Sequence, residues 1–84
     1  MSGGYFDYTQ QHLIYIANEI EKIIQTNPEQ FDKPTLMEFK EALGLLRLGY
    51  IYCNRIDLLL SGDDNPESFR IKLFKEINDL AKKE

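Results

Sequence analysis

A chain of 84 residues with a net charge of −4 and a pI of about 4.9 predicts one small domain without a general attraction for nucleic-acid phosphates. Its apolar content of 43% excludes a disordered chain, and its single cysteine, Cys53, excludes an intrachain disulfide and fits a reducing compartment. Because the sequence shows neither a secretory signal nor a run of about 20 apolar residues, we expect one cytoplasmic domain over residues 1–84.

Residues 1–8 form a short arm that contains glycine and three aromatic side chains, Tyr5, Phe6 and Tyr8. A free terminal arm is usually polar, so this composition predicts that the arm docks on something. The aromatic rings either plug the end of the fold or line a ligand pocket or a subunit contact.

The first helix is predicted over residues 9–26, with Asp7 and Gln10 as a capping box and Pro28 beyond its end. His12 has no cysteine or second histidine at ligand spacing, which argues against a metal site. One amphipathic stripe follows the helix and consists of Leu13, Ile16, Ala17, Ile20, Ile23 and Ile24.

The second helix is predicted over residues 35–61, which makes it the longest element. Thr35 and Glu38 form a capping-box pattern at its start, and Gly62 supplies the stop. Its apolar arc covers about half of the cylinder, so two neighbours can pack on it. Within this arc Gly49 predicts the close approach of another helix, because glycine is otherwise unfavourable in a helix interior.

The opposite side of this helix gathers three bases, Lys40, Arg47 and Arg55. These bases are bordered at spacings of three and four by polar side chains, among them Tyr50, Asn54 and Asp57. One interpretation is a solvated face that keeps the helix soluble. The other is an anion site, because arginine holds phosphate or carboxylate bidentately.

The third helix is predicted over residues 66–81, with Asn65 as its N-cap and Pro66 at its first position. The acids Asp63, Asp64 and Glu67 suit the positive end of the helix dipole. They lack the alternating spacing of a calcium loop, so we expect capping instead of metal binding.

Together these elements predict an all-α fold, an antiparallel three-helix bundle with a long central helix. The two outer helices are shorter than the central one, so part of its apolar arc stays uncovered in a single chain. An exposed apolar patch of this kind marks an association surface. We therefore expect a homo-oligomer, most simply a two-fold dimer.

Two stretches carry a resemblance to known proteins. The opening Met1-Ser2-Gly3-Gly4-Tyr5-Phe6-Asp7-Tyr8 and the later run from Arg55 to Asp64, with Glu67-Ser68-Phe69 following, resemble short phage and prophage proteins. This resemblance covers about a quarter of the chain and implies a viral or mobile-element origin. It brings no assigned chemistry, although small phage accessory proteins often counter host defence.

Catalysis is the weakest functional hypothesis, because the sequence has no nucleophile–histidine pair, no metal-ligand spacing and no phosphate loop. We expect no cofactor and no contact with nucleic acid or membrane. The first hypothesis is a counter-defence protein that sequesters a small anionic, nucleotide-like signal. The alternatives are an inhibitor or regulator that binds a host protein, and a plain oligomeric scaffold. The predicted ligand-binding residues are Arg47, Arg55, Tyr50, Asn54, Asp57, Tyr5, Phe6 and Tyr8.

Overall fold

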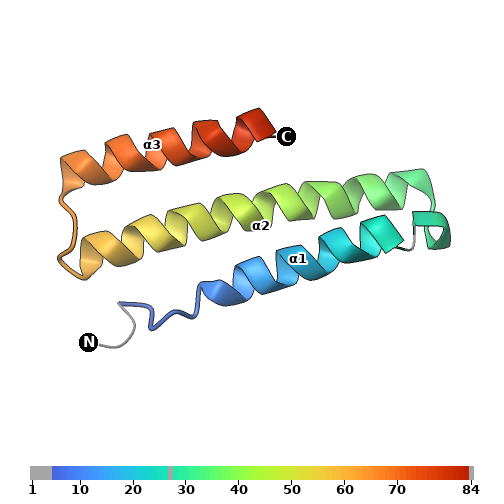
Figure 1. Cartoon of the computed structure of the whole chain (residues 1–84), viewed down its shortest axis with the longest axis horizontal. Coiled ribbons are helices and arrows are strands. Elements are labelled where there is room, and N and C mark those ends of the chain that lie inside the picture. Colours follow the sequence, from blue (N-terminus) through green and yellow to red (C-terminus); the bar gives the residue numbers. More distant parts are fainter. Residues whose placement is uncertain (1–4, 27, 84) are drawn as a thin grey trace.

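The computed structural model describes residues 5–26 and 28–83, and it contains three α-helices in succession. These are α1 (Gln11–Thr26), α2 (Lys33–Leu60) and α3 (Pro66–Lys83), with a short 3-10 turn, η1 (Pro28–Gln30), after α1. Successive helices run in opposite directions, and α2 lies between the other two (Figure 1). The described residues form no strand. An all-α, antiparallel fold with a long central helix is thus confirmed; the first four residues of the predicted arm and Asn27 lie outside the described residues.

The central helix begins two residues earlier than predicted. Its N-cap is Asp32, whose backbone is extended and whose side chain accepts a 3.0 Å hydrogen bond from the Thr35 backbone N–H. Proline is well tolerated in the first helical turn because it has no N–H that needs a partner, so Pro34 lies inside the helix. The predicted cap at Thr35 was therefore wrong. Hydrogen bonds from the Thr35 side chain and then from its backbone N–H lower the pKa of the Asp32 carboxyl.

The first helix begins at Gln11, two residues later than predicted. Asp7 and Tyr8 have φ of 55° and 64°, in the left-handed region, whereas an N-cap residue needs an extended backbone. The predicted capping box of Asp7 with Gln10 therefore does not form. The Gln10 side chain instead donates to Asp57 of α2.

The turn after α2 has the helix stop and the helix cap that the sequence predicted. Gly62 has φ of +84°, and the N–H groups of Gly62 and Asp63 donate to the carbonyls of Leu59 and Leu58, respectively. This is the pair of bonds that closes a helix in a Schellman motif. Asn65 then accepts a 2.9 Å hydrogen bond from the Ser68 N–H and caps α3, as predicted.

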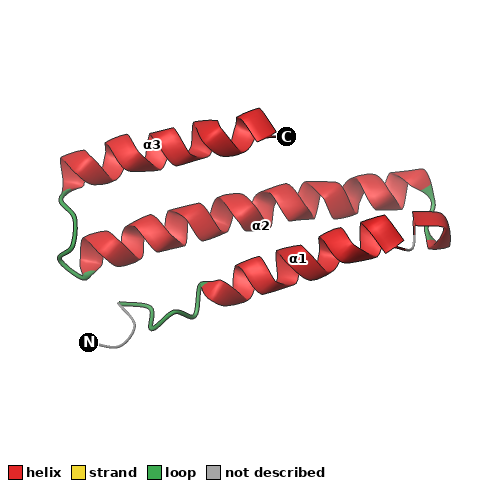
Figure 2. Ribbon diagram, in the orientation of Figure 1, coloured by secondary structure: helices red, strands yellow, loops and turns green. Residues whose placement is uncertain are grey.

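The three helices lie side by side in one layer (Figure 2). The Cα atoms extend over 46 × 27 × 14 Å, and the shortest dimension is close to the thickness of one helix with its side chains. The radius of gyration is 15.2 Å, whereas a compact chain of this length has about 12 Å. Both α1 and α3 pack on α2 along opposite edges, so the bundle is open.

A single open layer of helices buries few hydrophobic side chains completely. Ala17, on the line where α1 meets α2, is the one fully covered hydrophobic side chain among the described residues. Nearby, a Cβ added to Gly49 would lie 3.8 Å from the Leu13 side chain, an ordinary contact distance and not a forced close approach. At the far end Phe31 packs on Phe39, with ring centroids 5.2 Å apart.

The layer has two unlike sides. Arg47 and Arg55 of α2 pair with Glu21 of α1 and Glu76 of α3, which defines one side as the charged face. At about 100° per residue, Gly49 and its neighbours on the helix surface project from the opposite side of α2. We call that side the apolar face. On helical projection its apolar members are Leu13, Ile16, Ile20 and Ile23 of α1, Leu45, Gly49, Tyr52, Ile56 and Leu60 of α2, and Phe74 and Ile77 of α3. Two charged side chains, Glu38 and Arg70, fall on the same stripes of α2 and α3.

Candidate functional site

The end of α2 holds the N-terminal arm through one carboxylate. Asp57 is 6% exposed and accepts hydrogen bonds from the Tyr5 backbone N–H at 2.6 Å and from Gln10 Nε2 at 2.8 Å. The Ser61 hydroxyl donates to the same carboxylate at 3.1 Å, and Gln10 Nε2 also lies 3.3 Å from Asn54 Oδ1. The contacts of Tyr5 and Gln10 join residues more than 40 positions apart and attach the described part of the arm to the central helix.

Hydrogen bonding keeps this carboxylate ionised. The Gln10 amide is the largest cause that lowers the pKa of Asp57, and the Tyr5 N–H and the Ser61 hydroxyl add to it against the opposing effect of burial. A carboxylate whose oxygens already accept these donors is committed to holding the arm. We therefore assign Asp57 a structural role, as the anchor of residues 5–10.

The aromatic side chains of the arm stay largely in contact with solvent. Tyr5 is 65% and Tyr8 59% exposed, while Phe6 is partly covered and meets the Tyr5 ring edge-on at 5.5 Å. The arm thus docks through its backbone and through Gln10 rather than by inserting its rings into the fold.

Arg47 and Tyr50 lie on the α1 side of the central helix. Arg47 Nη2 is 2.8 Å from Glu21 Oε1, and the Tyr50 hydroxyl accepts a 3.0 Å hydrogen bond from Gln11 Nε2. Both partners belong to α1, so these side chains fasten the first two helices together. The positive charge of Arg47 is compensated at this contact.

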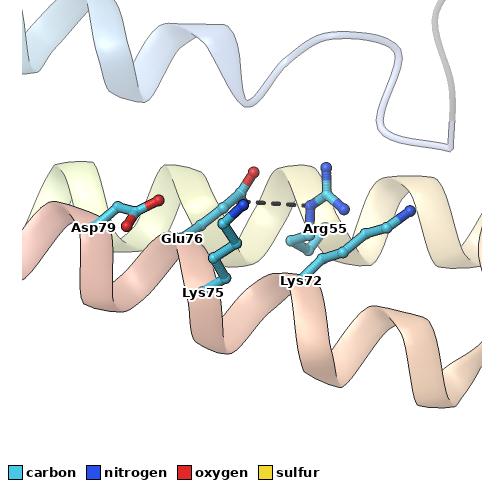
Figure 3. Close-up of a pocket in the computed structure, with 5 residues that line it drawn as sticks. All are labelled: Arg55, Lys72, Lys75, Glu76 and Asp79. Carbon is cyan, nitrogen blue, oxygen red and sulfur yellow. Dashed lines mark ion pairs between the residues drawn. The ribbon is translucent and has the colours of Figure 1, made fainter.

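Arg55 lies on the other flank of α2, against α3. Its side chain is 13% exposed, with Nε 3.4 Å from Glu76 Oε1 and Nη1 3.9 Å from the covered Asp64 carboxylate. Figure 3 shows Arg55 beside four charged side chains of α3, which together line a shallow pocket of about 260 Å³; they are Lys72, Lys75, Glu76 and Asp79. Three bases and two acids therefore meet at this edge.

The neighbouring Asp64 is also held ionised. A hydrogen bond from the Ser68 side chain is the largest cause that lowers its pKa, and the nearby charges of Lys72 and Arg55 contribute. Asp64 thus interacts with Ser68 at the start of α3, whereas the roles expected of Asp63 and Glu67 stay predictions.

The structure separates the predicted ligand residues into two groups. Arg47, Tyr50, Asn54 and Asp57 face α1 and the arm, whereas Arg55 faces α3 on the opposite edge of α2. The structure does not bring the two arginines to one ligand.

Sequence reasoning missed Gln10, Lys72 and Lys75. One signal for Gln10 was available: it lies seven residues before Ala17, on the line that faces α2, and a polar residue there calls for a buried partner. The two lysines carried no such signal, because only the packing of α3 on α2 places them beside Arg55.

Comparison with known proteins adds no relative. No family model matches the chain, and no curated protein or solved structure matches it either. Within the part of the chain that the structure describes, no group of three or more potential ligands is arranged to hold a metal ion. In the same residues, no helix combines the length and apolar character needed to cross a bilayer.

Proposed function

We propose that this chain is a non-enzymatic, phage-type accessory protein of the cytoplasm that acts by binding another protein chain through its apolar face. The observation that supports this proposal is the one-sided layer. Leu45 and Phe74, from two different helices, are 59% and 67% exposed, and helical projection puts both on the apolar face. Large apolar side chains gathered on one side of a soluble fold indicate a protein-association surface.

The charged face supports this proposal because, unlike the apolar face, its main side chains already have partners within the chain. Its two arginines are matched with acids of neighbouring helices, so their charges serve the packing of the layer. What is left without an internal partner is hydrophobic area, and hydrophobic area drives association between proteins.

Carbene footprinting in cells that express the full chain tests the proposal without assuming what covers the face. Leu45 and Phe74 should be protected, while Tyr15 and Met37 should be labelled strongly. These last two side chains are matched controls, because they are 65% and 68% exposed and lie outside the apolar face. Equal labelling of all four side chains would refute the proposal.

A second candidate is sequestration of a small anion, and the pocket beside α3 favours it. Arg55, Lys72 and Lys75 surround a space of about 260 Å³, and phosphate groups are bound by such cationic side chains. Because Glu76 and Asp79 share the pocket, the excess positive charge there is small.

Thermal unfolding with a panel of nucleotides tests this candidate. A rise in Tm that the Lys72→Gln and Lys75→Gln double variant removes, and that Lys40→Gln retains, would support it. Lys40 is the matched control, because it is an exposed base outside the pocket. The absence of any shift across the panel would exclude this function.

A further inference from the structure

The apolar face has no cover within the described chain. The arm is attached at the C-terminal end of α2 through Asp57 and Ser61, and the connections between helices are short. Protein domains are stable as two packed layers around a core, whereas this chain supplies one layer. The described residues therefore supply no second layer to cover the apolar face.

The exposed area fits a partner of standard size. The chain exposes 6286 Å², whereas a monomeric globular protein of 9.9 kDa exposes about 5,200 Å². The excess of about 1,100 Å² exceeds the roughly 800 Å² that each partner buries in a typical stable complex. Covering one face of the layer would therefore lower the accessible surface area to about that of an ordinary globular protein of this mass.

We propose that a second copy of this chain covers the face, so that two layers stack face to face about a two-fold axis; this inference rests on the proposed function and names its partner. In a two-fold contact the same surface serves both copies, which suits a flat face to which all three helices contribute apolar side chains. Leu45, Tyr52 and Phe74 of each copy meet the corresponding side of the other.

The charge distribution fits this stacking. Contact through the charged faces would withdraw their ion pairs from water, which costs free energy. Stacking through the apolar faces directs the pairs of Arg47 with Glu21 and of Arg55 with Glu76 outward on both layers. The product is a six-helix, two-layer particle with charged outer faces and an apolar interior.

Light scattering after size exclusion on the full chain, from submicromolar to submillimolar concentration, tests the inference. The expected mass is twice 9.9 kDa. Leu45→Lys should halve the mass, and Met37→Lys should leave it unchanged. Met37 is the matched control, because it is 68% exposed against 59% for Leu45 and lies outside the face.

A photo-crosslinking residue at position 45 covers the case in which Leu45→Lys fails to fold. It should link two copies through residues of the apolar face, and the same residue at position 37 should not. A helical wild-type chain that stays at 9.9 kDa throughout would overturn the second copy as partner. If footprinting still showed the face protected in cells, the proposed function would survive; if it showed no protection, both would fail.

Discussion

Replacing Gly49 with alanine should stabilise the chain, although its place in the apolar arc suggests the opposite. The added methyl group would lie 3.8 Å from Leu13 Cδ1, which is ordinary van der Waals contact. Alanine in a helix interior is favoured over glycine by about 1 kcal/mol. For a domain of this size a gain of about 1 kcal/mol corresponds to a Tm increase of about 4–8 °C.

Gly44→Ala is the matched control for this prediction. No atom lies within 4 Å of the position that its Cβ would take, so the substitution reports helix propensity alone and should also raise Tm by a few degrees. Gly62→Ala should do the reverse, because Gly62 has φ of +84°, where a Cβ costs about 1 kcal/mol or more.

The assay is thermal unfolding followed by circular dichroism, at concentrations low enough to separate any dimer. Under these conditions Gly49→Ala and Gly44→Ala should raise Tm, and Gly62→Ala should lower it. A decrease for Gly49→Ala together with an increase for Gly44→Ala would refute the reasoning, since it would mean that a surface closer than Leu13 lies over Gly49.

Three other substitutions have defined outcomes. Asn65→Ala removes the oxygen that accepts the Ser68 N–H, and urea unfolding should show a loss of about 1 kcal/mol that Asn65→Asp largely avoids. Ala17→Leu adds volume at a fully covered position between α1 and α2, and the same urea assay should show a loss of about 1–3 kcal/mol. Asp57→Asn should flatten the dependence of Tm on acid pH: its folded-state pKa lies below the ordinary value of 3.8, so its contribution is present above that value and is lost as pH falls through the folded-state pKa. Identical acid profiles for the wild type and Asp57→Asn would contradict this assignment.

The sequence predicted helix ends correctly where only one nearby residue could cap or stop the helix. The stop at Gly62 and the cap at Asn65 followed by Pro66 are features of four or five adjacent residues, and both are confirmed. The start of α2 was misplaced because two capping residues, Asp32 and Thr35, lie on either side of Pro34. Proline was interpreted as a boundary, although it also fits the first helical turn.

The candidate site was less predictable because it depends on contacts between distant residues. The spacing of Arg47 and Arg55 placed both on the polar side of one helix, but it could not show that α1 would cover one and α3 the other. Likewise, Tyr5 and Gln10 meet Asp57 across separations of 52 and 47 positions, for which no local periodicity exists. The width of the apolar arc was evident from the sequence, whereas the flat layer depends on how the outer helices divide that arc.

The order of the helices across the layer also shapes how the chain assembles. Each helix packs mainly on its neighbour in sequence, so α1 with α2 and α2 with α3 form two overlapping hairpins whose contacts are local. Chains dominated by local contacts fold rapidly. Because α3 shares the smaller interface with α2, it can detach while the first hairpin persists. Amide hydrogens of α3 should accordingly exchange with solvent at a lower free energy than those of α1, which gives this small fold a separable C-terminal third.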